Sequence, residues 1–173
     1  TDRAPADGVI TRWSLTSGAA NGPVTLRVLR QRFTAGIPEG VTPVSSGATE
    51  TTVNGTGTWS TRQPIKAGDF IAVRNTNSTL MFAPTAGASI TKSVGALPDN
   101  QFGAVTAVAG RELLVHAVVE PDADGDNFGD VSQDACPGDA ASQTAPCRPD
   151  FAISGSAVLT PTRLRRSAQQ CGV

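Results

Sequence analysis

Residues 8–15, GVITRWSL, decide the fold class of this chain. Apolar and polar side chains alternate along the stretch, and a period of two is typical of a β-strand that is buried on one face. The residues expected on the buried face are Val9, Thr11, Trp13 and Leu15, and those expected on the opposite face are Arg12 and Ser14. The chain therefore begins with a half-buried strand.

The same alternation returns in residues 24–33, VTLRVLRQRF. The residues expected to face the core are Val24, Leu26 and Val28, and those expected to face water are Thr25 and Arg27. Residues 110–121, GRELLVHAVVEP, are apolar on both faces, with Leu113, Val115, Ala117 and Val119 on one and Leu114 and Val118 on the other. An element that is apolar on both faces is expected to be a central strand between two layers.

Turn residues separate these runs. The chain has 18 Gly and 12 Pro, residues 34–50 are punctuated by both, and Asn54-Gly55 suggests a hairpin turn. No segment shows helical periodicity with caps. Many short strands with turns between them predict an all-β domain, an antiparallel β-sandwich of jelly-roll-like type, over residues 1–120.

The character of the chain changes at Pro121, where an Asp-rich module (residues 121–149) begins, followed by a C-terminal segment (residues 150–173) with one possible strand, residues 151–159. The net charge is −1, but five of the 15 acidic residues lie in residues 121–138, which leaves 10 acidic against 14 basic residues elsewhere. Near-neutrality gives no reason to expect nucleic acid or an anionic membrane as a partner. No apolar run is long enough to span a membrane.

The Asp-rich stretch PDADGDNFGDVSQDACPG (residues 121–138) has the spacing of a metal-binding loop. Carboxylates at alternate positions can converge on one point, and hard oxygen ligands at this density suit Ca²⁺. The expected ligands are Asp122, Asp124, Asp126, the backbone carbonyl of Phe128, Asp130 and Asp134. Asn127 takes the place of the usual turn glycine, and Gln133 stands where a bidentate acid is expected, one residue before Asp134. The alternative is a solvated acidic linker.

The three cysteines, Cys136, Cys147 and Cys171, lie late in the chain. They form no C-x-x-C pair and the chain has a single histidine, which argues against a zinc site. A Cys136–Cys147 disulfide closing a small loop is favoured in an oxidising compartment. Cys171 would then be free or would pair between chains.

The stretch DADGDNFGDVSQDACPGDAASQTAPC (residues 122–147) resembles the thrombospondin type 3 repeat, in the form seen in secreted actinobacterial proteins, where it often follows a β-sandwich. Residues 4–30, 61–73 and 112–121 also resemble that sandwich, and this looser resemblance covers most of residues 4–120. The resemblance implies calcium ligands at Asp122, Asp124, Asp126, Asp130 and Asp134, and a Cys136–Cys147 bridge.

Catalysis has little support in the sequence. The single His116 sits in mid-strand, and there is no G-x-S-x-G motif, no phosphate-binding loop and no second histidine. Carboxylates for glycoside chemistry would have to come from Glu39, Glu50, Asp69, Glu112 or Glu120. All but Asp69 are expected to be solvated surface residues, and Asp69 is expected to shape the turn that precedes its strand.

The leading prediction is a secreted or cell-surface, non-enzymatic structural or adhesive protein with a calcium-stabilised connector. Residues 151–159 and Cys171 could join copies of the chain into an oligomer or filament by strand donation. Apart from Ca²⁺ and other copies of the chain, the expected partner of the protein is a surface glycan or another protein. The alternative is a carbohydrate-binding module. Such a site needs a row of exposed aromatic rings, and the chain offers two Trp and six Phe, with Trp13 on the expected core face and Trp59 as the one remaining Trp.

Overall fold

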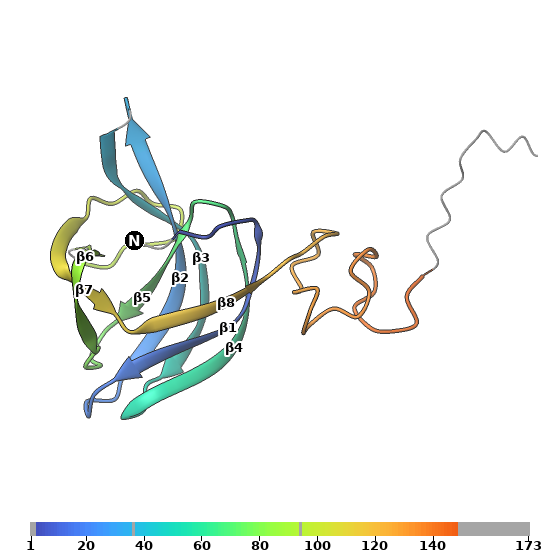
Figure 1. The fold of residues 1–173 in the computed structure, drawn as a ribbon, viewed down its shortest axis with the longest axis horizontal. Coiled ribbons are helices and arrows are strands. Elements are labelled where there is room, and N and C mark those ends of the chain that lie inside the picture. Colours follow the sequence, from blue (N-terminus) through green and yellow to red (C-terminus); the bar gives the residue numbers. More distant parts are fainter. Residues whose placement is uncertain (1–2, 36, 94, 149–173) are drawn as a thin grey trace, which may run out of the picture.

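A computed structural model describes residues 3–35, 37–93 and 95–148, and this part of the chain is all-β, with antiparallel strands and no helix. The strands are β1 (Gly8–Ser17), β2 (Pro23–Thr34), β3 (Ile37–Thr51), β4 (Gly55–Ile65), β5 (Phe70–Asn75), β6 (Phe82–Lys92), β7 (Thr106–Leu113) and β8 (Val115–Glu120). Figure 1 shows the Asp-rich module following β8 at one end of the strands. Among the described residues there is no helix with the length and apolarity to cross a membrane. The expected strand at 151–159 and Cys171 lie outside the described residues.

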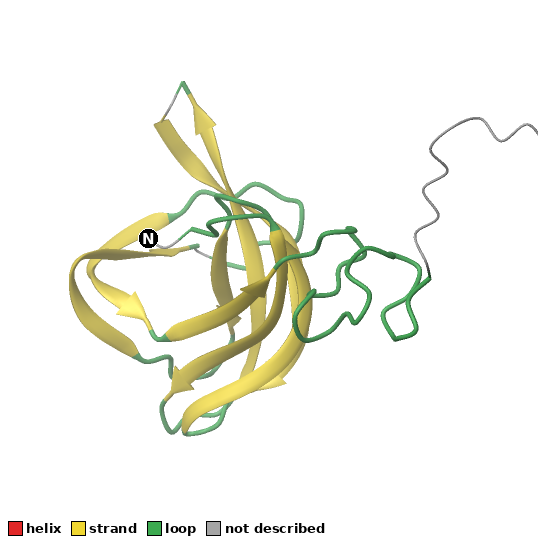
Figure 2. Ribbon diagram, turned by 45° about the vertical axis from the view of Figure 1, so that its right-hand side comes forward, coloured by secondary structure: helices red, strands yellow, loops and turns green. Residues whose placement is uncertain are grey.

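The strands form two three-stranded sheets and a two-stranded ribbon (Figure 2). The sheets have the orders β4-β1-β8 and β3-β2-β5, and β6 pairs with β7. The core lies between the two central strands, β1 and β2. Its buried members are Ile10, Trp13, Leu15, Val24, Leu26, Val28 and Ile65. This arrangement agrees with the expected β-sandwich.

The alternation in β2 is confirmed, since Val24, Leu26 and Val28 are fully buried. In β1 the expected burial of Val9 and Thr11 is confirmed (0% and 5% exposed), but the placing of both on the face of Trp13 and Leu15 is wrong. The register shifts between Ile10 and Arg12 against both neighbouring strands, and Ile10, rather than Val9, belongs to the core cluster with Trp13 and Leu15. A β-bulge moves the following side chains to the opposite face, which simple alternation cannot predict.

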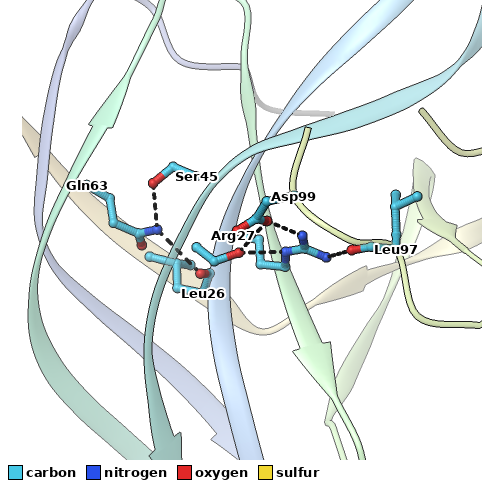
Figure 3. A network of polar contacts seen from close by, with 7 residues as sticks. Leu26, Arg27, Ser45, Gln63, Leu97 and Asp99 are labelled. Carbon is cyan, nitrogen blue, oxygen red and sulfur yellow. Dashed lines mark hydrogen bonds and ion pairs between the residues drawn. The ribbon is translucent and has the colours of Figure 1, made fainter. Parts of the chain in front are cut away.

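Arg27 was expected to face water, but it is only 7% exposed (Figure 3). Its guanidinium donates hydrogen bonds to the Ser46 hydroxyl (2.9 Å), the Leu97 carbonyl and the Asp99 carboxylate, with which it forms an ion pair. A charged side chain is tolerated in this position because every part of its fork has an acceptor. The sequence-based prediction failed because two of the three acceptors lie 70 and 72 residues further along the chain, in the loop of residues 97–99.

The expected central strand over residues 110–121 is two strands in different sheets. Leu113 ends β7 in the ribbon, and Val115 begins β8 at the edge of the β4-β1-β8 sheet. Between them, Leu114 donates its N–H to the Met81 carbonyl and accepts a hydrogen bond from Thr16 N–H. The apolar residues on both faces therefore belong to an element that changes sheet.

Two further features of the chain differ from expectation. Residues 34–50 contain most of the longest strand, β3, which keeps Pro38 and Pro43 because it lies at a sheet edge and shifts register against β2. Asn54-Gly55 leads from β3 into β4, which pairs with β1, so the connection crosses between sheets instead of making a hairpin turn. Gly55 does adopt the positive φ (104°) that such a dipeptide predicts.

Candidate metal centre

The Asp-rich loop is wrapped around the carboxylate of Asp122. Its Oδ1 accepts hydrogen bonds from the N–H groups of Gly125 (2.9 Å) and Asp126 (3.1 Å), and its Oδ2 accepts one from Asn127 (3.1 Å). Gly125 and Asn127 turn the chain with positive φ angles of 77° and 67°. Asn127 therefore supplies the left-handed conformation expected of the turn position, which asparagine tolerates better than most residues.

This turn brings three carboxylates together. Oxygen atoms of Asp122, Asp124 and Asp126 all lie within 4.8 Å of one another, so this group could hold a metal ion. The pKa of the Asp124 carboxyl is raised, first by its burial and then by repulsion from the carboxylates of Asp126, Asp134 and Asp122, although the Asp126 N–H opposes the shift. Burial is the main cause of the raised pKa of Asp124, and repulsion from the three other carboxylates adds to it.

Hydrogen bonding distinguishes two of these acids from the rest. The Oδ2 atoms of Asp124 and Asp134 are buried and have no hydrogen-bond partner in the described part of the chain. The residue Asp134 is only 5% exposed, and its Oδ1 accepts the N–H of Cys136 (2.7 Å). An unpartnered buried carboxylate oxygen costs free energy unless a cation coordinates it. Asp134, displaced by one residue from the usual ligand position, thus has the free oxygen that a ligand requires.

The other expected ligands have different surroundings. Both oxygens of Asp130 accept the N–H of Ala123 (3.2 Å each), which closes the loop onto its own start. Phe128 donates its N–H to Asp126 Oδ1 (2.8 Å), and its ring lies 4.0 Å from the guanidinium carbon of Arg62 in β4. The structure thus brings Asp122, Asp124 and Asp126 into one group, whereas Asp130 faces the loop backbone.

The expected disulfide between Cys136 and Cys147 is present. The disulfide closes a loop that contains Gln143, and this residue contacts the Asp-rich loop. Gln143 Nε2 donates to Asp126 Oδ2 (2.7 Å), and the Gln143 carbonyl accepts the N–H of Ala135 (3.0 Å). The disulfide-closed loop therefore holds one of the three clustered carboxylates in place.

Glu120 was expected to be a solvated surface residue, and this was wrong. It is 7% exposed, and its carboxylate accepts four hydrogen bonds: Oε1 from the hydroxyls of Thr11 (2.8 Å) and Ser132 (2.7 Å), and Oε2 from the N–H groups of Val131 (3.1 Å) and Ser132 (2.8 Å). Burial alone would raise the pKa of Glu120, but the four hydrogen bonds outweigh it and lower the pKa below its ordinary value. Because its oxygens are already engaged, Glu120 is a docking residue and not a free ligand.

The only sequence signal for this role is a position: an acid that ends an apolar strand immediately before an acidic module. The donors that bury it, in Thr11 and in residues 131–132, are distant in the sequence or unremarkable within it.

The residues considered for other functions have plain roles. Asp69 is 2% exposed, accepts a two-pronged hydrogen bond from Arg30 (2.9 and 2.8 Å) and caps the N–H of Lys66 (3.1 Å), which confirms that it shapes the turn before β5. Trp59 is half-buried and packs on the core with its ring centroid 4.6 Å from that of Trp13. Trp59 is therefore not an exposed platform for a sugar ring.

His116 is exposed on β8 opposite Ser14 of β1. The two residues line a shallow depression of about 340 Å³ with Arg12, Trp13, Thr58 and Val118, and no carboxylate belongs to this lining. His116 and Ser14 therefore have beside them no carboxylate in this lining that could orient the histidine as a base.

Comparisons with known proteins add no relative. A scan against protein-family models, a search of curated proteins and a search of solved structures each found no significant match.

Proposed function

We propose that this chain is a secreted or cell-surface, non-enzymatic structural or adhesive protein, in which a jelly-roll-like β-sandwich is followed by a Ca²⁺-binding connector of the thrombospondin type 3 kind. The ion would neutralise the crowded carboxylates and fix the loop. The proposal rests mainly on one observation: two buried carboxylate oxygens, Oδ2 of Asp124 within the group and Oδ2 of Asp134, whose charge repels that of Asp124, have no hydrogen-bond partner among the described residues.

The choice of Ca²⁺ follows from the ligand type. The group offers carboxylate oxygens of Asp122, Asp124 and Asp126, and Asp134 has a further unpartnered carboxylate oxygen. Ca²⁺ takes six to eight such hard ligands in irregular geometry. Mg²⁺ demands a tighter octahedron and retains its water, so it fits a loop of this kind less well. The disulfide in the same module suits an oxidising, extracellular compartment.

Calorimetric titration of the 173-residue chain with CaCl₂ tests the proposal. Ca²⁺ should bind with a Kd of about 10⁻³ M or tighter, the range of extracellular modules, and MgCl₂ should bind more weakly. At a free Ca²⁺ concentration of about 100 times Kd, the free energy of unfolding should rise by about 2.7 kcal/mol. An absence of heat and of any thermal shift at millimolar Ca²⁺ would show that the segment is an acidic linker.

Self-assembly is the second part of the proposal. Residues 151–159, FAISGSAVL, carry apolar side chains at alternate positions apart from Gly155, namely Phe151, Ile153, Ala157 and Leu159, a pattern that suits a donated strand. In the described part of the chain β8 pairs on one side only, with β1, so its other edge is available to a strand. Light scattering on the full chain, compared with a variant truncated after residue 148, should show oligomers for the full chain alone; monomers in both would remove this part.

A further inference from the structure

The Asp-rich loop is attached to the sandwich by side chains as well as by the chain itself. The Glu120 carboxylate, at the end of β8, accepts hydrogen bonds from the backbone of Val131 and Ser132 and from the hydroxyls of Ser132 and Thr11. No cationic side chain of the described residues pairs with it. Its buried charge is therefore stabilised by the loop that docks on it, and the loop is held by that charge.

The bulge in the β4-β1-β8 sheet supplies the remaining contacts. In the strand register, Thr11 of β1 and Thr61 and Arg62 of β4 are the residues left without a partner. All three contact the module: the Thr11 hydroxyl binds Glu120, the Thr61 carbonyl accepts the side-chain amide of Gln133 (2.8 Å), and the Arg62 guanidinium stacks on Phe128. The bulge thus turns three groups out of the sheet and toward the loop.

The two surfaces approach too closely for any side chain at Gly129. A Cβ atom there would lie 2.4 Å from Thr11 Cγ2 and 2.6 Å from Glu120 Oε2. Because both neighbours are held by the hydrogen bond between them, neither can move away without breaking it. The loop is therefore seated on the sandwich at a defined position.

The docked segment also leads directly into Asp134, the buried acid that has an unpartnered oxygen. The Gly129 carbonyl accepts the N–H groups of Gln133 (2.9 Å) and Asp134 (3.0 Å), so the anchored residues 131–133 end directly at Asp134. A shift of the anchored turn would therefore move Asp134 and its unpartnered carboxylate oxygen.

We propose that Glu120 is a positioning residue for the cation site: it holds the 129–134 turn against the sandwich in the arrangement that binds the ion, and so couples ion binding to sandwich stability. This inference rests on the proposed function, since it assumes that the loop binds Ca²⁺. Because the coupling is reciprocal, Ca²⁺ strengthens the docking by the same factor by which docking strengthens Ca²⁺ binding.

The test compares Ca²⁺ affinity and thermal stability in the full chain. Glu120→Ala removes the acceptor without removing a ligand and should weaken Ca²⁺ binding about tenfold or more, as loss of a group that supports a metal ligand commonly does. Glu120→Gln keeps an acceptor for the two N–H groups and can donate to the two hydroxyls, so it should recover part of the affinity. Glu112→Ala, an exposed acid on β7, makes the same change of charge and should leave the Kd unchanged.

Thr11→Val is a milder second variant, because it removes one hydroxyl donor at nearly constant shape. It should weaken Ca²⁺ binding by a smaller factor than Glu120→Ala while leaving the near-ultraviolet signal of the Trp13–Trp59 pair intact. It keeps the test valid if Glu120→Ala does not fold. For each variant, the rise in Tm caused by Ca²⁺ should shrink with the affinity.

The outcomes separate this inference from the proposed function. If the unsubstituted chain does not bind Ca²⁺, the proposed function fails and the inference fails with it. If the unsubstituted chain binds but the folded Glu120 and Thr11 variants bind with the same Kd and lose only thermal stability, the connector stands and the coupling is overturned.

Discussion

The side-chain amide of Gln133 donates a 2.8 Å hydrogen bond to the backbone carbonyl of Thr61, and so links the Asp-rich loop to β4 of the sandwich. Gln133 stands at the twelfth position of the loop, where a calcium loop usually has a bidentate acid. The contact gives this departure a physical reason. An amide can donate to a carbonyl and a carboxylate cannot, so the twelfth position serves docking while the next residue, Asp134, has the free oxygen.

Gln133→Glu should therefore fail to improve the site, although it restores the usual acid. The variant loses the donor to Thr61 and places a negative charge beside a carbonyl oxygen, so the free energy of unfolding should fall by about 1–2 kcal/mol. Denaturant titration and calorimetry with Ca²⁺ measure both effects. Gln101→Glu, in an exposed loop, controls for the added charge. A tenfold gain in Ca²⁺ affinity at Gln133→Glu alone would show that this side chain reaches the ion.

Asp134→Asn should have opposite effects with and without Ca²⁺. Without the ion, neutralising a buried and partly unpartnered carboxylate beside Asp124 should leave the chain as stable or about 1 kcal/mol more stable. With the ion, the variant should lose most of the stabilisation because a ligand is gone. Thermal melts in EDTA and in CaCl₂ give both values. Asp139→Asn, whose oxygens already accept N–H groups of Ala141 and Arg148, should retain the Ca²⁺ response; an equal loss there would contradict the assignment.

Alternation alone was enough to predict the fold class, because β2 and most of β1 bury one face against a single core. It failed where distant segments decide the local structure. Arg27 is buried only because residues 97–99 fold over it, β3 keeps its prolines only because it lies at an edge, and β7 and β8 separate because the chain changes sheet. These outcomes depend on tertiary contacts that no short window contains.

At the candidate metal centre, too, local sequence predicted some features and distant contacts decided others. Carboxylate spacing was enough to bring Asp122, Asp124 and Asp126 together, because one turn of local chain controls their positions. The role of Glu120 could not be predicted, since its partners are Thr11 at the far end of the sandwich sequence, the Ser132 hydroxyl and two backbone N–H groups. Local spacing therefore predicted the group of three carboxylates that could hold an ion, and the docking surface became visible only in the fold.

Trp59→Ala should behave as a core substitution. The ring packs on Trp13, so its removal should lower the free energy of unfolding by about 2–3 kcal/mol and weaken the near-ultraviolet circular dichroism of the pair. Phe33→Ala, which truncates a 48% exposed ring, should cost less than about 1 kcal/mol. A glycan array on both variants completes the measurement: glycan binding that disappears at Trp59→Ala without loss of stability would revive the carbohydrate-binding alternative.

Asp99→Asn should destabilise the chain in a pH-dependent way. The hydrogen bond from Arg27 lowers the pKa of Asp99 below its ordinary value of 3.8, against the opposing effect of burial and with help from the Ser46 hydroxyl and the charges of Arg27 and Arg74. At pH 7 the free energy of unfolding of the variant should be lower by about 1 kcal/mol, a value kept small because the Asp99 side chain is 45% exposed.

A depressed pKa means that the Asp99 carboxylate contributes its full stabilisation above its unfolded pKa and that this stabilisation is lost as the pH falls through the folded pKa. The difference in unfolding free energy between the unsubstituted chain and Asp99→Asn should thus stay constant from about pH 7 to pH 5 and shrink toward zero below about pH 4. Urea titrations across this range, with Glu112→Gln as an exposed control, measure the difference. A difference near zero at every pH would mean that Arg27 is held by its other two acceptors and not by Asp99.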